Sequence, residues 1–198
     1  MASFTSAKDV IRTDLDYICE ELAEDFPKLS GKRILITGAG GGLGRDGRWG
    51  RLGVFGAVEV TVYDNFIRGV PDWLTALEGD ANLTVTRYDI TQPLPEGMGY
   101  FPYIIHAASI ASPVYYRKYP IETMDANVDG LRRVLNYCLE MKDAGTPVEG
   151  LLYYSTSEIY GDPDPANIPT PETYRGNVSC TGPRACYDES KRYGETLC

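Results

Sequence analysis

Residues 33–44 read Arg33-Ile-Leu-Ile-Thr-Gly-Ala-Gly-Gly-Gly-Leu-Gly44, an apolar run that passes directly into glycines. A short continuous apolar run is typical of a strand buried on both faces of a parallel sheet. Gly38, Gly41 and Gly44 follow at a spacing of three, which permits a tight turn with accessible backbone N–H groups. This stretch predicts the first strand of an open α/β sheet and, after it, a turn suited to binding a pyrophosphate at a helix N-terminus.

The rest of the chain continues the same alternation of strands and helices. Between further apolar runs lie stretches with helical periodicity, and Ser6 with Asp9 resembles a capping box at the start of the first one. This order predicts right-handed βαβ crossovers and a Rossmann-type doubly wound parallel sheet. We assign residues 1–30 to an N-terminal helical extension and residues 31–198 to the sheet domain. The predicted strands are 33–37, 58–63, 83–88, 103–107 and 151–155, and the predicted helices are 8–26, 70–77, 121–142 and 187–198.

One segment does not fit this alternation. Arg45–Gly56 reads RDGRWGRLGVFG, with four glycines and no apolar stripe, where a helix should follow the glycine turn. Each interior glycine costs a helix about 1 kcal/mol relative to alanine. The segment therefore predicts either a long loop or the translation of a reading-frame error, and resequencing of the coding DNA separates these.

Composition narrows the classes of partner. The chain has 19 Lys and Arg against 28 Asp and Glu, a net charge of −9, which opposes binding to nucleic acid or to an anionic membrane surface. The acidic N-terminus lacks the apolar core of a signal peptide, and no apolar run is long enough to span a bilayer. We therefore expect a cytoplasmic protein.

The cysteines and the single histidine limit the kinds of bonding and catalysis that we expect of this chain. The five cysteines are scattered without a CxxC pair, so we expect neither a disulfide framework nor a metal site. His106 is the only histidine, which removes most metal-dependent and Ser-His-Asp mechanisms. We expect this residue to pack at a strand end rather than to act in catalysis.

The end of the second predicted strand indicates which dinucleotide would bind. Asp64 follows that strand, twenty residues after Gly44. A carboxylate there can accept hydrogen bonds from the adenosine ribose hydroxyls and would repel a 2′-phosphate, which favours NAD over NADP. The alternative is an ordinary turn acid before Asn65.

A second group of residues lies later in the chain. Ser155-Thr-Ser-Glu158 follows the fifth predicted strand, at the edge of the sheet where α/β proteins bind ligands. Tyr187 and Lys191 lie four residues apart, on one face of a helix, so the ammonium should lower the tyrosine pKa from about 10. Thr156 could hydrogen-bond a substrate oxygen whose proton Tyr187 takes. Together these residues predict a hydroxyl-oxidising site without histidine, and a surface Tyr-Lys pair is the alternative.

Five blocks of sequence carry a resemblance to a known family. Over residues 31–198 the chain resembles the extended short-chain dehydrogenases/reductases of the NAD-dependent epimerase/dehydratase family, and within it the UDP-glucuronate decarboxylases most. The blocks are Tyr63-Asp-Asn-Phe66, His106-Ala-Ala-Ser-Ile-Ala-Ser-Pro113, Asn127-Val-Asp-Gly130, Ser155-Thr-Ser-Glu-Ile-Tyr-Gly-Asp-Pro163 and Gly176-Asn-Val-Ser-Cys-Thr-Gly-Pro-Arg-Ala-Cys-Tyr-Asp-Glu-Ser-Lys-Arg192.

The resemblance implies a binding mode for NAD. The glycines would hold the pyrophosphate, the end of the second strand the ribose and the end of the third strand the adenine. Asn127 would serve as a structural or cofactor-side residue. The cofactor-binding residues implied are Gly38, Gly41, Gly44, Asp64, Asn65, Asp89, Ile90, Ala107, Ala108, Asn127, Tyr187 and Lys191.

The resemblance also implies catalytic roles for four residues. Thr156 would polarise the sugar 4-hydroxyl and Tyr187 would be the base. Lys191 would bind the nicotinamide ribose and lower the tyrosine pKa. Glu158 would manage the proton at C5 of the sugar.

The residue between Thr156 and Glu158 helps to choose among relatives. Related 4,6-dehydratases carry Asp in the position of Ser157, to protonate the departing 6-hydroxyl, and 4-epimerases usually lack the following Glu. The triplet therefore favours decarboxylation of UDP-glucuronate to UDP-xylose through a 4-keto intermediate. A nucleotide-sugar 4,6-dehydratase, a 4-epimerase and an inactive or regulatory NAD-binding fragment remain as alternatives.

The resemblance also bears on the extent of the protein. It implies that the chain stops shortly after Lys191, without the C-terminal substrate domain of its relatives. The implied partners are a UDP-sugar substrate and, at full length, a second copy of the protein. The dimer face would be formed by the helices 121–142 and 187–198.

Overall fold

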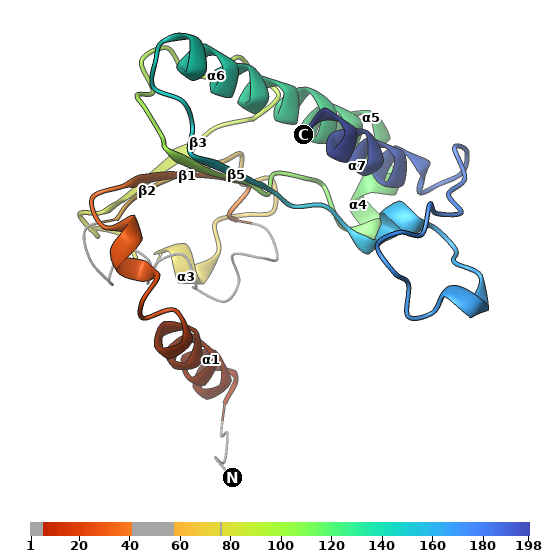
Figure 1. Cartoon of the computed structure of the whole chain (residues 1–198), viewed down its shortest axis with the longest axis horizontal. Coiled ribbons are helices and arrows are strands. Elements are labelled where there is room, and N and C mark those ends of the chain that lie inside the picture. Colours follow the sequence, from red (N-terminus) through yellow and green to blue (C-terminus); the bar gives the residue numbers. More distant parts are fainter. Residues whose placement is uncertain (1–5, 41–57, 76) are drawn as a thin grey trace.

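The computed structural model describes residues 6–40, 58–75 and 77–198, and its centre is a parallel sheet (Figure 1). All strand pairs are parallel, and the strand order is β3-β2-β1-β4-β5. Every predicted strand is present with small shifts of its ends, and the doubly wound α/β prediction is confirmed. The strands are β1 (Arg33–Thr37), β2 (Glu59–Asp64), β3 (Leu83–Arg87), β4 (Tyr103–His106) and β5 (Gly150–Tyr153).

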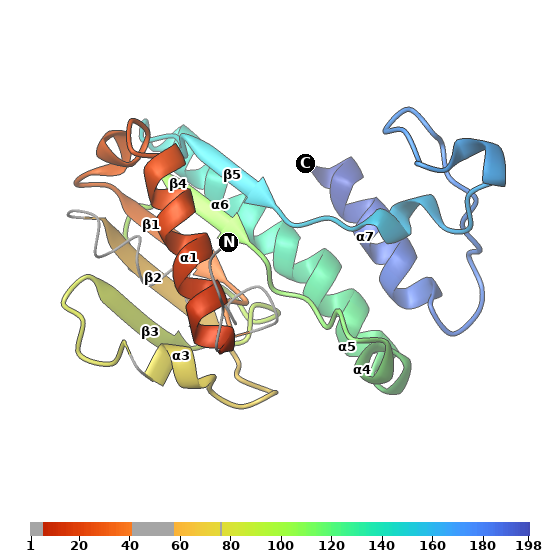
Figure 2. The same cartoon turned by 90° about the horizontal axis from the view of Figure 1, so that it is seen from below.

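Helices cover both faces of the sheet. In Figures 1 and 2, α5, α6 and α7 lie on one side of the sheet and α1 and α3 on the other. The bounds are α1 (Ala7–Glu21), α3 (Asp72–Thr75), α4 (Pro113–Lys118), α5 (Pro120–Asp125), α6 (Leu131–Asp143) and α7 (Ala185–Leu197). The shorter helical segments within the described residues are η1 (Phe26–Leu29), η3 (Ala126–Gly130), η4 (Ser157–Tyr160) and η5 (Pro165–Asn167).

Three predicted helices differ from the observed ones. The helix predicted over 8–26 ends at Glu21, and a separate 3₁₀ turn then begins at Phe26 with Pro27 in its first turn. The predicted helix 121–142 is divided by the π-helical turn η3, and the one predicted over 70–77 is reduced to α3. Helix α4 was not predicted, although it begins at Pro113 and proline is favoured as the first residue of a helix.

The predicted start of the first helix is confirmed. Ser6 Oγ accepts a hydrogen bond from the Asp9 backbone N–H at 3.3 Å, and Asp9 Oδ2 accepts one from the Ser6 N–H at 2.9 Å. This reciprocal arrangement satisfies two N–H groups that would otherwise lack intrahelical partners.

The core lies on both faces of β1. Leu35 packs on the side of α6, with Val134 and Tyr137, whereas Ile34 and Ile36 pack on the opposite face. Alternate residues of a strand point to opposite faces, and both faces of β1 are covered, so its apolar run is continuous. Full burial of one such side chain stabilises the fold by about 1.5–3 kcal/mol.

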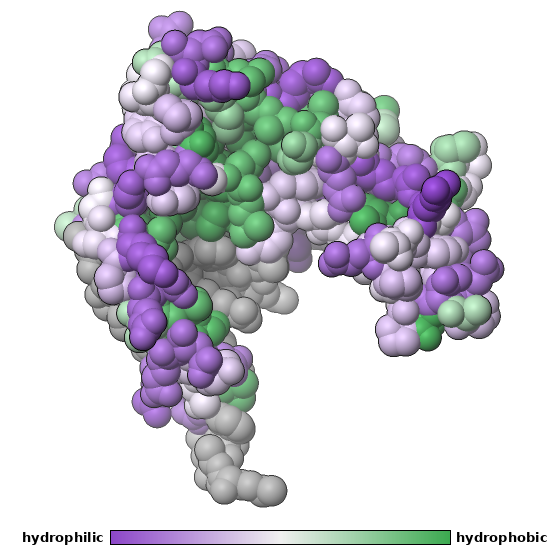
Figure 3. Space-filling view, in the orientation of Figure 1, coloured by the Kyte–Doolittle hydropathy of each residue, from purple (hydrophilic) through white to green (hydrophobic). Residues whose placement is uncertain are grey.

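The outer edge of β5 differs from this buried centre. Among the strands described, β5 pairs only with β4, and Leu152 is 53% exposed. Figure 3 shows apolar surface over the region of β5 and α6, where Leu139 is also exposed. Within the described ranges no helix has the length and apolar character needed to cross a membrane. The segment Arg45–Gly56 lies outside the described residues.

Candidate functional site

The site begins where the strand order reverses, between β1 and β4. Gly38 directly follows β1 and has a positive φ of 78°. A Cβ on it would lie 2.3 Å from Ala108 Cα, so no other residue fits without moving the backbone after β4. Ala107 continues the contact between the two strands, because its N–H donates to the Thr37 carbonyl at 2.9 Å. The crevice at such a reversal point is where open α/β sheets bind their ligands.

Asp64, the last residue of β2, is joined to the glycine turn. Its Oδ2 accepts a hydrogen bond from the Gly40 N–H at 2.8 Å, and its Oδ1 accepts one from the Phe66 N–H at 2.7 Å. A carboxylate has about four acceptor positions, so capacity remains for the hydroxyls of a ligand. Asn65 next to it is held by a bond from the Ile67 N–H to its Oδ1 at 3.0 Å.

The end of β3 completes one groove with these residues. Asp89 Oδ1 accepts hydrogen bonds from the Thr91 N–H and hydroxyl, at 3.0 and 2.8 Å. Ile90 is buried against Gly130. A Cβ added to Gly130 would lie only 2.8 Å from Ile90 Cγ2. Six of the predicted cofactor-binding residues line this groove: Gly38, Asp64, Asn65, Asp89, Ile90 and Ala108. The predicted residues Gly41 and Gly44 lie outside the described residues.

His106 lies in the core, as predicted. It is 1% exposed, and its Nδ1 is 2.7 Å from the Thr37 hydroxyl. Burial lowers its pKa to about 3, so the ring is neutral near pH 7. This contact links the last residue of β4 to the last residue of β1.

Two of the predicted catalytic residues lie together. Thr156 is the N-cap of η4, and its hydroxyl accepts a hydrogen bond from the Glu158 N–H at 3.3 Å. Tyr187 of α7 is buried, and the Thr156 side chain interacts with its phenol in the direction that lowers the pKa. The ring of Tyr187 stacks on Tyr116 of α4, with centroids 5.1 Å apart. Tyr116 was not among the predicted site residues. The only feature of the sequence that could have indicated it is its position shortly after the block that ends at Pro113.

The pKa of Tyr187 is not lowered in this structure, contrary to the prediction. Burial raises the pKa of Tyr187 instead, and the interaction with Thr156 opposes that rise only in part. Lys191 is 3% exposed, its ammonium donates to the Tyr154 carbonyl at 2.6 Å, and burial lowers its own pKa to about 8. The four-residue spacing placed both residues on one helix face, but it could not show that a carbonyl after β5 engages the ammonium.

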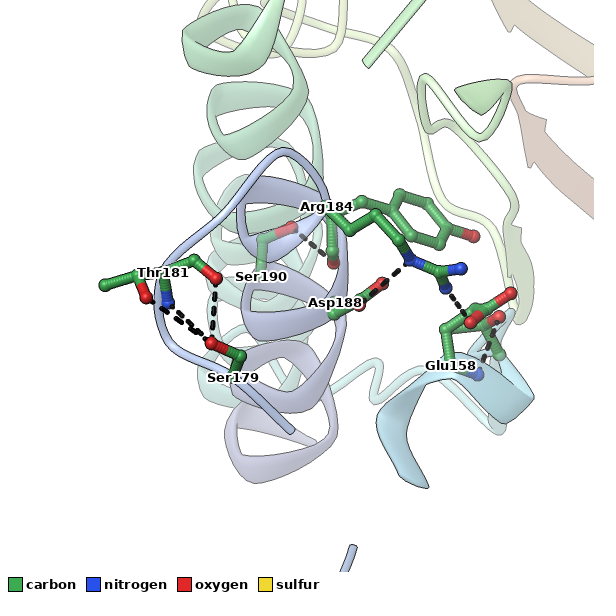
Figure 4. A network of polar contacts seen from close by, with 8 residues as sticks. Glu158, Ser179, Thr181, Arg184, Asp188 and Ser190 are labelled. Atoms are coloured by element: carbon green, nitrogen blue, oxygen red, sulfur yellow. Dashed lines mark hydrogen bonds and ion pairs between the residues drawn. The ribbon is translucent and has the colours of Figure 1, made fainter. Parts of the chain in front are cut away.

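Glu158 is paired with a cation that the sequence analysis did not assign a role. Arg184 donates from Nη2 to Glu158 Oε2, and its Nε lies 3.4 Å from Asp188 Oδ2 (Figure 4). Arg184 belongs to the long block that carries the family resemblance, which was the available signal. The chemistry of Glu158 is therefore that of a carboxylate beside a guanidinium.

Asn127 is buried behind α7 and does not line the groove. Its Nδ2 donates to Ser190 Oγ at 2.8 Å, and Ser190 in turn donates to the Tyr187 carbonyl at 3.0 Å. Its Oδ1 is buried without a hydrogen-bond partner among the described residues. Asn127 thus connects the π-helical turn η3 to the helix that carries Tyr187 and Lys191.

The chain is similar to known proteins both in sequence and in fold. Residues 34–198 match the model of the NAD dependent epimerase/dehydratase family. UDP-glucuronic acid decarboxylase 5 of Arabidopsis thaliana is 39% identical over 168 residues, covering 85% of this chain and 46% of that protein. UDP-glucuronic acid decarboxylase 1 of Xenopus tropicalis is 41% identical over 171 residues, covering 84% and 37%. A solved NAD dependent-NDP-hexosamine 5,6-dehydratase, TunA, involved in tunicamycin biosynthesis, superposes with a TM-score of 0.63 at 30% identity, covering 84% and 48%.

The strand order and the groove at its reversal point define a dinucleotide-binding α/β protein with a Rossmann-type sheet. More particularly, the chain belongs to the NAD-dependent epimerase/dehydratase family, a family of enzymes whose cofactor is NAD. It spans less than half the length of the two curated relatives described above.

Proposed function

We propose that this chain is the cofactor-binding and catalytic part of a nucleotide-sugar decarboxylase, which converts UDP-glucuronate to UDP-xylose. The observation that carries the proposal is the Thr156–Tyr187 contact at the carboxyl end of the sheet, next to a Glu at position 158. Support for this substrate class comes from the two relatives named UDP-glucuronic acid decarboxylase. Ser157 supports decarboxylation over 4,6-dehydration, because a serine hydroxyl is a poor acid for a leaving hydroxyl.

The groove has the features that NAD requires. Because Gly38 has no side chain, the backbone after β4 can approach it closely. Gly40 likewise has no side chain that would crowd the carboxylate of Asp64, a residue that lines the groove. We infer that the turn holds the pyrophosphate, that Asp64 and Asn65 hold the adenosine ribose, and that the end of β3 contacts the adenine. When bound, NAD supplies a hydride acceptor for the sugar and returns the hydride later, so the reaction has no net redox change.

The residues of η4 and α7 then handle the protons. Thr156 hydrogen-bonds the 4-hydroxyl of the sugar, and Tyr187 takes its proton as the C4 carbonyl forms. For this role the pKa of Tyr187 must fall below the raised value that burial imposes. Lys191, one helical turn away, is the cation that can lower it, once its ammonium faces the hydroxyl rather than the Tyr154 carbonyl.

Loss of CO₂ follows from the position of the new ketone. With a carbonyl at C4, the carboxylate on C5 is that of a β-keto acid. The C5–C6 bond breaks, its electron pair passes into the C4 carbonyl as an enolate, and C6 leaves as CO₂. Glu158 provides the group that returns a proton to C5, and the ketone is then reduced. Loss of CO₂ from the carboxylate consumes one proton, which Glu158 takes from water and passes to C5, and it needs no oxidant.

Two measurements on the 198-residue chain test this proposal. The first is calorimetric titration with NAD, with NADP as the control, and we expect NAD to bind more tightly. The second is incubation with UDP-glucuronate and NAD, followed by CO₂ release and by NMR identification of the sugar product. A 4-keto-6-deoxy product or a C4 epimer would instead assign a dehydratase or an epimerase. NAD binding without turnover would indicate a non-catalytic fragment.

We further propose the remaining properties of the protein. Residues 1–30 form an extension outside the domain of residues 31–198, and the acidic composition with unpaired cysteines supports a cytoplasmic location. A homodimer at full length is supported by exposed apolar side chains on α5, α6 and α7, namely Ile121, Leu139 and Tyr193. Analytical ultracentrifugation of the wild-type chain and of Leu139→Glu tests the dimer, because a charge on the shared face should shift the mass toward the monomer.

A further inference from the structure

Arg184, the N-cap residue of α7, is in contact with two carboxylates that come from different elements. Its Nη2 donates to Glu158 in η4, and its Nε lies 3.4 Å from Asp188 in the first turn of α7. Figure 4 shows the guanidinium between the two acids. One cation therefore joins the segment after β5 to the start of the helix that carries Tyr187.

The two carboxylates differ in burial. The Asp188 side chain is 10% exposed, and its Oδ1 is buried without a hydrogen-bond partner among the residues described. The Glu158 side chain is 40% exposed, and that of Arg184 is 43% exposed. A buried carboxylate is costly unless a cation accompanies it, whereas an exposed pair contributes little to stability. Asp188 is therefore the anchor that holds the guanidinium, and Glu158 is the solvent-facing partner that the guanidinium holds.

This cation lies within electrostatic reach of the reacting group. Arg184 lowers the pKa of Tyr187 and Asp188 raises it, so both lie near the phenol that interacts with Thr156. The charged side chain in contact with Glu158 in the described structure is that of Arg184, which also pairs with Asp188 of α7, and Tyr187 of the same helix stacks on Tyr116 of α4. Arg192, the residue after Lys191 in α7, donates to the Ile159 carbonyl at 2.8 Å rather than to Glu158.

We propose that Arg184 is a positioning residue, anchored by Asp188, that keeps Glu158 ionised and fixed beside the Thr156–Tyr187 pair. This inference rests on the proposed function, in which Glu158 exchanges the proton at C5. The substrate brings a second carboxylate to the same place, and two neighbouring carboxylates favour protonation of one of them. A guanidinium beside Glu158 offsets that repulsion, so the residue rests as a carboxylate, takes a proton from water and, being the stronger acid, passes it to C5.

The test compares Arg184→Gln with a matched control, Arg192→Gln, in the 198-residue chain. Both variants remove a guanidinium from α7 that contacts η4, but only the first removes one from Glu158. With ¹³C-labelled glutamate, the carboxyl signal of Glu158 is assigned by its loss in Glu158→Gln and then titrated. We expect the midpoint to rise by about 1 unit in Arg184→Gln and to stay unchanged in Arg192→Gln.

Arg184→Lys is the second variant and guards against misfolding. It keeps the charge and should return the midpoint most of the way to the wild-type value, with an unchanged circular dichroism spectrum. The limb of the pH profile for CO₂ release that Glu158 sets should move with the midpoint. A Glu158 midpoint that is the same in wild type, Arg184→Gln and Arg184→Lys would overturn the proposal. A shifted midpoint without CO₂ release from any variant would support the hold of Arg184 on Glu158 and contradict the decarboxylation instead.

Discussion

The cofactor groove and the catalytic cluster are built in different ways, although both lie at the carboxyl ends of the strands. In the groove, the positions of the residues are set mainly by backbone geometry. Gly38 fits only because it has no side chain, and Asp64 is held by two backbone N–H groups. In the cluster, long side chains from separate elements meet, as Arg184 meets Glu158 and Tyr187 meets Tyr116. The groove is therefore sensitive to added atoms, whereas the cluster is sensitive to lost functional groups and charges.

The largest effect that this contrast predicts is at Gly38. Gly38→Ala would place a Cβ 2.3 Å from Ala108 Cα at a φ of 78°, so both strain and overpacking oppose it. We expect a loss of about 2–5 kcal/mol in the free energy of unfolding, together with loss of NAD binding. Urea unfolding and calorimetry measure the two effects.

Gly31→Ala is the control for this prediction. Its φ is 73°, but no atom lies within 4 Å of the added Cβ, so only the backbone strain of about 1–2 kcal/mol applies. If the two variants lost equal stability, close approach of the strands would not be the reason for glycine at position 38.

The second prediction removes a single hydroxyl from the cluster. Tyr187→Phe keeps the ring that stacks on Tyr116 but removes the group that contacts Thr156. We expect turnover of UDP-glucuronate to fall by about 10²–10⁴-fold, a far larger loss than any change in NAD affinity. Tyr193→Phe, which removes an exposed hydroxyl bonded to Arg132, is the control. Equal turnover in wild type and Tyr187→Phe would remove Tyr187 from the proposed mechanism.

The same contrast explains how much the sequence could predict. The strands, their order in the chain and the groove residues after β1, β2 and β3 were predicted, because apolar runs and glycine spacing act locally. The partners in the cluster were not, because Glu158 and Arg184 are 26 residues apart and their contact depends on how η4 meets α7. The direction of the Tyr187 pKa shift was missed for the same reason: burial by Tyr116 and the capture of the Lys191 ammonium by Tyr154 are tertiary features.

A third prediction sharpens the claim that the groove selects NAD. Asp64→Asn keeps the shape of the side chain but removes its negative charge and one acceptor. We expect NAD to bind about 10-fold more weakly and the preference for NAD over NADP to shrink by a similar factor. Asp80→Asn is the control, because Asp80 also accepts a backbone hydrogen bond, from Asn82, but stands just before the start of β3, at the opposite end of the sheet. An unchanged NAD to NADP preference in Asp64→Asn would contradict the role given to this carboxylate.

The last prediction concerns the buried ammonium of Lys191 and separates packing from function. Because burial lowers its pKa to about 8 from 10.5, the folded chain releases this proton at a lower pH than the unfolded chain does. Between pH 8 and 10.5 the unfolded state binds more protons, so the contribution of Lys191 to stability rises with pH, whereas below pH 8 both states are protonated and it stays constant. Relative to Lys191→Met, the wild-type chain should gain about 1–2 kcal/mol in the free energy of unfolding between pH 7 and 9.5. Urea unfolding at several pH values measures the difference, and Lys118→Met, an exposed lysine, should show no such gain. If the difference in free energy of unfolding between wild type and Lys191→Met did not change with pH, the ammonium of Lys191 would already be hydrated in the folded chain. It would then be free to turn toward Tyr187 without leaving a buried partner.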